Sequence, residues 1–156
     1  MKPQKQKYLH CPEEGQYGDC YRTCLACLLD LDRDDVPHFV DTMDPGEWER
    51  SVQPRVDAWL RERGFVELAL PATGDCDLDT ILQLISSRGV YTILTGTSAT
   101  GCNHCVIVGP DRSIHDPGRD NPGIVGPADD GFWWLSVLVP VQMAHQAPAR
   151  TEEVGL

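Results

Sequence analysis

Three residues that are far apart in this chain have the side chains and the order of a thiol-based catalytic triad. Cys20 follows Gly18 and Asp19 and opens an apolar run, so we expect it to begin a helix. The first amides of a helix have no partner within it and the helix dipole is positive there, which stabilises a thiolate and lowers its pKa. His104 would then activate the thiol as a base, and Asp116 would orient the imidazole. This set predicts attack by Cys20 on a carbonyl group.

The spacing of His104 and Asp116 predicts that they are neighbours in space. His104 opens an apolar run over 104–108, and a second extended run over 112–115 ends just before Asp116. If a tight turn joins these runs as an antiparallel hairpin, both residues lie at the same end of it. His115 is a competing base, but its side chain would point to the face opposite Asp116, so we favour His104.

Attack on an amide also requires hydrogen-bond donors for the oxyanion that forms on the carbonyl. Gln16 lies four residues before Cys20, and we expect its side-chain amide to donate to the oxyanion beside the Cys20 backbone amide. His104 would take the thiol proton and later protonate the departing amine. This chemistry needs no cofactor, and we expect none.

The elements that position these residues change in type along the chain. Apolar residues recur at helical spacing in the first half, whereas short apolar or alternating runs follow in the second half. We expect helices over 20–31, over 45–63 with a break at Pro54, and from Asp75 or Asp77 to Arg88, and strands over 65–70, 90–94, 104–108, 112–115 and 133–139. Helices followed by strands predict an α+β domain in which the N-terminal helix bearing the nucleophile packs on a mostly antiparallel sheet.

Length and composition favour one globular domain over residues 1–156, with flexible ends over 1–12 and 143–156. The net charge of -11 repels nucleic-acid phosphates and anionic lipids, so we expect neither as a partner. The sequence contains no apolar stretch of about 20 residues and no signal-peptide core, so we expect no membrane span and a cytoplasmic location. In such a chain seven cysteines predict mostly free thiols.

Three short runs carry the candidate triad: Gly18-Asp19-Cys20, His104-Cys105-Val106-Ile107-Val108 and Ile114-His115-Asp116-Pro117. Together they resemble the papain-like cysteine peptidases, and specifically the bacteriocin-processing peptidase domains, which cleave leader peptides after double glycine. The likeness covers most of residues 16–117. It implies a papain-like fold and a Cys-His-Asp triad that acts on a peptide or protein substrate.

The sequence departs from that family at two positions. Tyr21 follows the nucleophile, where the family usually has glycine, and Glu14 stands six residues before it, where the family commonly has its oxyanion glutamine. The same thiol chemistry also serves cleavage of isopeptides and small amides, deamidation and acyl transfer. The residues therefore predict amide chemistry and leave the substrate open.

Two other hypotheses compete with a thiol hydrolase. One is a structural zinc site built from soft ligands, for which the candidates are Cys24, Cys27, Cys102, His104 and Cys105. Zinc sites place Cys-x-x-Cys in tight turns, whereas Cys24 and Cys27 fall within the expected helix, where we interpret them as small buried hydrophobic residues. The other is a catalytically inactive peptide-binding module of the same fold.

Overall fold

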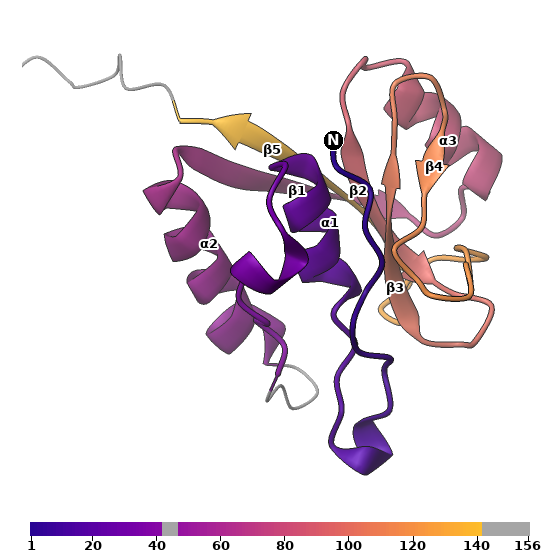
Figure 1. Cartoon of the computed structure of the whole chain (residues 1–156). Helices are drawn as coiled ribbons and strands as arrows, with labels where there is room; N and C mark the ends of the chain where they lie inside the picture. The colour runs from indigo at the N-terminus through magenta and orange to yellow at the C-terminus, as the bar shows by residue number, and fades with distance from the viewer. Residues whose placement is uncertain (42–46, 142–156) are drawn as a thin grey trace, which may run out of the picture.

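A five-stranded antiparallel sheet forms the centre of the described part of the chain, which comprises residues 1–41 and 47–141 of a computed structural model (Figure 1). From one edge to the other the sheet contains β1 (Phe65–Thr73), β5 (Phe132–Pro140), β2 (Thr92–Thr97), β3 (Asn103–Val108) and β4 (Ile114–His115). Each neighbouring pair is antiparallel. The expected α+β class and antiparallel sheet are confirmed.

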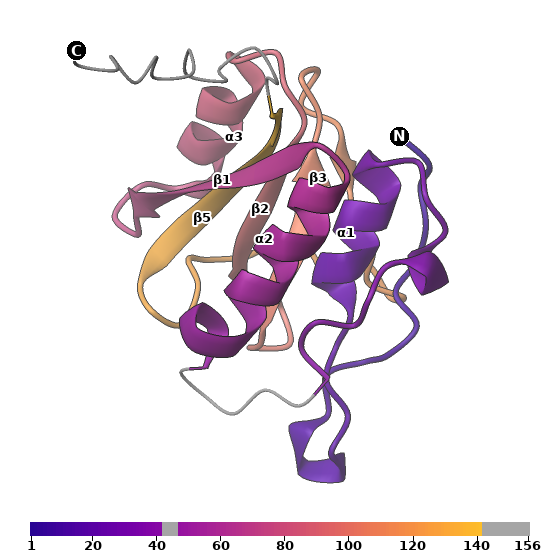
Figure 2. The ribbon, with the colours of Figure 1, turned by 90° about the vertical axis from the view of Figure 1, so that its left-hand side faces the viewer.

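Helices pack on both faces of this sheet. The helices α1 (Cys20–Leu28) and α2 (Gln53–Glu62) cover one face, and α3 (Leu78–Ser86) packs on the other (Figure 2). Side chains alternate between the two faces of a strand, so Ile107 joins the core under α1 and α2 while Val106 joins the core under α3. α1 contacts β3 directly.

Local sequence signals explain where the other helices begin and end. Asp77 caps α3, since its carboxylate accepts a hydrogen bond of 2.8 Å from the amide of Thr80. Pro54 lies in the first turn of α2, and a single π-helical turn, η3 (Trp48–Val52), precedes it. The two-piece helix expected over 45–63 is therefore confirmed from residue 48 onward, while 45 and 46 lie outside the described residues.

Several boundaries differ from those expected. α1 ends at Leu28 instead of Leu31, and Asp30 adopts a left-handed backbone with a φ of 56° that cannot continue the helix. β1 continues through Pro71 to Thr73, which is possible because β1 is an edge strand and needs hydrogen bonds on one side only. The expected strand over 112–115 is reduced to β4, since Arg112 also has a positive φ of 66° within the turn.

The N-terminal segment, residues 1–12 of which are expected to be flexible, makes hydrogen bonds to α1 and to the loop after β4. It runs beside α1 (Figure 1), and the amide of Lys2 donates to the carbonyl of Cys27 at 3.0 Å. The side chain of Gln4 donates to the carbonyl of Leu31, and the amide of Gln6 donates to the carbonyl of Pro117 at 2.8 Å. These bonds satisfy backbone groups at the end of α1 and in the loop after β4. The other expected flexible end, 143–156, lies outside the described residues.

Candidate active site

Cys20 is the first residue of α1, and its side chain is partly exposed. Asp19 occupies the cap position before it, but its carboxylate makes no capping hydrogen bond to the helix. The first hydrogen bond of α1 instead runs from the amide of Thr23 to the carbonyl of Asp19. The amides of the first turn, including that of Cys20, therefore keep their positive field for a thiolate or an oxyanion.

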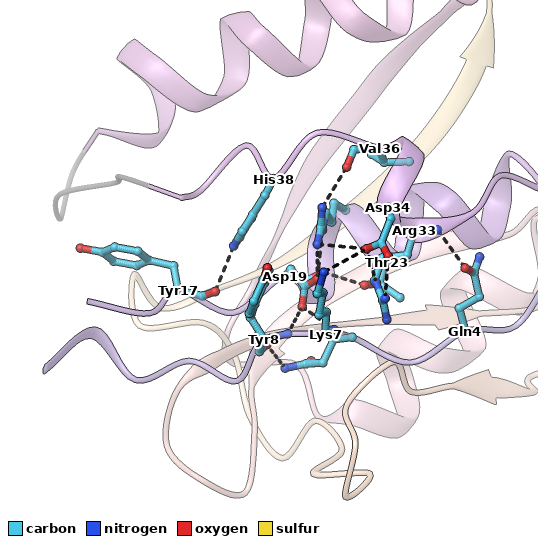
Figure 3. A network of polar contacts seen from close by, with 12 residues as sticks. Gln4, Lys7, Tyr8, Tyr17, Asp19, Thr23, Arg33, Asp34, Val36 and His38 are labelled. Atoms are coloured by element: carbon cyan, nitrogen blue, oxygen red, sulfur yellow. Dashed lines mark hydrogen bonds and ion pairs between the residues drawn. The ribbon is translucent and has the colours of Figure 1, made fainter. Parts of the chain in front are cut away.

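The Asp19 carboxylate fixes the start of α1 through three hydrogen bonds and an ion pair (Figure 3). One oxygen accepts from the amides of Lys7 and Tyr8, at 2.9 and 2.8 Å. The other accepts from Arg22 Nε at 2.9 Å and forms an ion pair with Arg22 Nη2 at the same distance. Asp19 is fully buried, and Arg22 also donates to the carbonyl of Val36. This ion pair ties the N-terminal segment, α1 and the segment after α1 to one point beside Cys20.

The hairpin of β3 and β4 brings His104 and Asp116 together as expected. His104 Nε2 and Asp116 Oδ1 are 2.7 Å apart. The same carboxylate accepts hydrogen bonds from the amides of Gly118 and Gly123, at 2.7 and 2.8 Å. Because Nε2 is bound to Asp116, Nδ1 is the ring nitrogen left for other partners. Interactions with both Cys20 and Asp116 raise the pKa of His104.

Electrostatics favour an ion pair between Cys20 and His104. The pKa of Cys20 is well below that of an ordinary thiol, because hydrogen bonds from Cys105 and His104 and the charge of His104 outweigh the opposing effect of burial. Burial alone would lower the pKa of His104, but its interactions with Cys20 and Asp116 raise it above the ordinary histidine value. Burial likewise opposes ionisation of Asp116, yet His104 and the two loop amides lower its pKa. A lowered pKa for Cys20 and a raised pKa for His104 both favour the pair of thiolate and imidazolium.

Cys105 is a member of this site that the sequence analysis does not assign to the triad. It follows His104 on β3, and its side chain lies in the core on the α1 face of the sheet. Its sulfur lies 3.2 Å from Thr95 Oγ1, and Cys20 packs against the core to which Cys105 belongs. The interaction with Cys20 and burial raise the pKa of Cys105 well above the ordinary thiol value. Strand alternation, which turns the residue after His104 toward the helix, is the signal that could have identified it.

Gln16 lies in the loop before α1, where its side-chain amide donates to the carbonyl of Leu9 at 2.8 Å. It also borders a cavity of about 560 Å³ beside Tyr8, Tyr17 and Arg22, which none of the three triad residues lines. Arg22 is two residues after Cys20 on α1, which places it on another side of the helix. The role of Gln16 as an oxyanion donor stays a prediction, and one N–H of its side-chain amide is already used by the carbonyl of Leu9.

The remaining cysteines and histidines near α1 are arranged as core residues. Cys24 and Cys27 are fully buried, as expected for small hydrophobic residues, and burial raises the pKa of both thiols. His115 faces the far end of α1, with Nε2 3.7 Å from the sulfur of Cys27 and 2.9 Å from the carbonyl of Gln4. Within residues 1–41 and 47–141, no three cysteine, histidine or acidic side chains gather as a metal site, so the zinc hypothesis gains no support.

Comparisons with protein-family models, with curated proteins and with solved structures find no match for this chain. The resemblance to papain-like peptidases therefore stays a prediction drawn from three short runs of residues. In the described ranges, no helix has the length and apolar character that a membrane crossing requires. The function of the protein is therefore inferred from the geometry of the site.

The buried ion pair of Asp19 predicts a large loss of stability when it is broken. In the variant Asp19→Ala, the guanidinium of Arg22 and the amides of Lys7 and Tyr8 lose their acceptor in the protein interior. Removing one partner of a buried ion pair typically costs about 3–5 kcal/mol in the free energy of unfolding. Urea unfolding of both proteins measures this difference. The control Asp34→Ala, which removes an exposed carboxylate from the same network, should change stability little, and an equal loss in both variants contradicts the assignment.

The ion pair of Cys20 and His104 predicts how alkylation depends on pH. Iodoacetamide should label Cys20 first at neutral pH, because a thiolate is the reactive form and the pKa of Cys20 is lowered. In Asp116→Asn, the imidazolium loses its carboxylate partner, so the pKa of His104 should fall and the apparent pKa of Cys20 should rise. Peptide mapping of alkylated protein over a pH series gives both values. Equal labelling of all seven cysteines, or a Cys20 profile that Asp116→Asn leaves unchanged, contradicts the ion pair.

Proposed function

We propose that this protein is a thiol-dependent hydrolase that cleaves a peptide, isopeptide or related amide bond through Cys20, His104 and Asp116, on a papain-like fold. The observation that carries the proposal is the position of His104, whose Nε2 lies 2.7 Å from Asp116 Oδ1 and whose pKa is raised by its interactions with Cys20 and Asp116. A buried histidine that served packing alone would not need both a thiol and a carboxylate fixed by two backbone amides. The helix start at Cys20 adds the field that a thiolate requires.

In the first half of the reaction, the thiolate of Cys20 attacks the carbonyl carbon of the amide. The oxyanion that forms is stabilised by the Cys20 backbone amide and, in this proposal, by the side-chain amide of Gln16. The imidazolium of His104 then donates its proton to the nitrogen of the leaving amine, and the carbon–nitrogen bond breaks. Asp116 keeps the ring of His104 in place and stabilises its positive charge.

In the second half of the reaction, neutral His104 accepts a proton from water, and the resulting hydroxide attacks the thioester. The carbon–sulfur bond breaks, the carboxylic acid leaves, and the thiolate and imidazolium form again. The substrate is a peptide, a protein or a small amide, and the net charge of -11 favours a neutral or basic one. If an amine replaces water in this step, the same site transfers the acyl group.

The pKa shifts predict a bell-shaped dependence of the rate on pH. Activity should rise at low pH as Cys20 ionises below the ordinary thiol range and fall at high pH as His104 loses the proton that the leaving amine needs. The raised pKa of His104 keeps the upper limb above the ordinary histidine range. Initial rates on a cleavable peptide over a pH series measure both limbs. A rate that rises only through the ordinary thiol range, near pH 8.5, contradicts the proposed pair.

An electrophilic peptide probe that reacts with activated thiols tests the triad directly. Wild type should be labelled at Cys20, and Cys20→Ala should not be labelled at all. His104→Ala should lower the labelling rate by about 10³-fold or more, because the thiol loses the group that ionises it. Asp116→Asn should lower it less, since Asp116 acts only through His104. A fluorogenic peptide library screened with the same variants then measures amide cleavage.

His115→Ala is the matched control, because His115 neighbours the triad in sequence but faces Cys27. This variant should be labelled at the wild-type rate. If His104→Ala and His115→Ala behave alike, the assignment of the base is wrong. If wild type is labelled no faster than Cys20→Ala, the chain is a binding module and not an enzyme. Elemental analysis of purified protein checks the zinc alternative, which requires one equivalent of zinc.

A further inference from the structure

We propose that Cys20 and Cys105 form a peroxide-sensitive dithiol site, in which Cys105 captures oxidised Cys20 as a disulfide. The inference requires a nucleophilic thiolate at Cys20 and does not depend on amide hydrolysis. Hydrogen peroxide or an alkyl hydroperoxide is the reactant. Closing the disulfide removes the nucleophile, and a thiol reductant restores it, so the site would act as a reversible switch.

The two thiols differ in the properties that assign their roles. Cys20 is partly exposed at the start of α1 and carries the lowered pKa of a thiolate, so peroxide reaches it and reacts there. Cys105 is only 7% exposed and keeps its proton, which protects it from direct oxidation. A reactive outer thiol beside a protected inner one is the arrangement in which the inner thiol resolves the oxidised outer one.

Cys20 and Cys105 meet where α1 packs on β3. Cys20 packs against the core that contains Cys105. The interaction between the two thiols is the largest cause of the pKa shift of each. Thr95, the cross-strand neighbour of Cys105 on β2, lies 3.2 Å from the Cys105 sulfur and fixes its orientation.

Cys24 is the nearest competitor, but its position on the helix opposes a bond to Cys20. It lies four residues after Cys20 on α1, where β-carbons are about 5–6 Å apart. A disulfide requires β-carbons about 3.5–4.5 Å apart, so the helix would have to distort. Cys24 is also fully buried, and burial raises the pKa of its thiol. Cys105 is therefore the partner that the structure favours.

The reaction proceeds in two balanced steps. The Cys20 thiolate attacks one oxygen of hydrogen peroxide, the oxygen–oxygen bond breaks, and the departing hydroxide takes the His104 proton to become water. Sulfur is oxidised by two electrons to the sulfenic acid while the peroxide is reduced. Cys105 then attacks this sulfur, the sulfur–oxygen bond breaks, and the thiol proton leaves with the hydroxyl group as a second water. Two thiols and one peroxide thus give one disulfide and two waters.

Mass spectrometry of the full chain under non-reducing conditions tests this site. After a small excess of hydrogen peroxide at neutral pH, wild type should lose the mass of two hydrogens, and peptide mapping should find Cys20 joined to Cys105. Dithiothreitol should reverse the change completely. In Cys105→Ser, Cys20 should instead gain two oxygens as sulfinic acid, so that dithiothreitol recovers at least about tenfold less free Cys20 than in wild type.

Cys24→Ser is the control variant and should form the same disulfide as wild type. The peptide map of wild type decides the question even if Cys105→Ser does not fold. A Cys20–Cys24 bond, a bond between two chains, or sulfinic acid in wild type with no disulfide overturns the proposal. Because the measurement is a mass and not a rate, a protein that forms the disulfide but cleaves no amide refutes only the proposed hydrolase.

Discussion

The burial of the Asp19 carboxylate is the constraint on which the position of the nucleophile depends. A charge without solvent must be fully hydrogen-bonded, and here the donors come from the N-terminal segment and from Arg22 on α1. Because Arg22 also binds the carbonyl of Val36, the segment that follows α1 is held to the same point. The orientation of the first turn of α1, and with it the sulfur of Cys20, follows from this arrangement.

Two opposing effects act on the ionisable groups of the site, burial and stabilisation by charged or hydrogen-bonding partners. Burial disfavours ionisation of Cys20 and Asp116, yet the pKa of each is lowered because every charge faces a partner or a hydrogen-bond donor. The loop after β4 supplies two amides to Asp116, and Lys5 of the N-terminal segment donates to the backbone carbonyl of Asp116 at 2.7 Å. The same N-terminal segment therefore supports both ends of the proposed triad, Cys20 through Asp19 and Asp116 through Lys5.

Local patterns in the sequence predicted the boundaries of a helix well where a few consecutive residues determine them. The cap at Asp77 and the break at Pro54 are properties of a few consecutive residues. The end of α1 was predicted three residues too late, because a left-handed residue at Asp30 is not visible in apolar periodicity. The length of β1 was underestimated, because Pro71 would break a central strand but is tolerated in an edge strand. Which strand lies at the edge depends on the order of strands in the sheet, and the whole chain sets that order.

The sequence by itself determined the residue types, their order and the hairpin that joins His104 to Asp116, because a short turn between two extended runs fixes that pairing locally. Only the tertiary structure decided which thiol meets the imidazole, because the contact of α1 with β3 joins residues separated by more than eighty positions. It also placed Cys105 beside Cys20, turned the amide of Gln16 toward Leu9 and bound the N-terminal segment along α1. These outcomes depend on burial and hydrogen bonding between distant segments, which no local pattern of residues encodes.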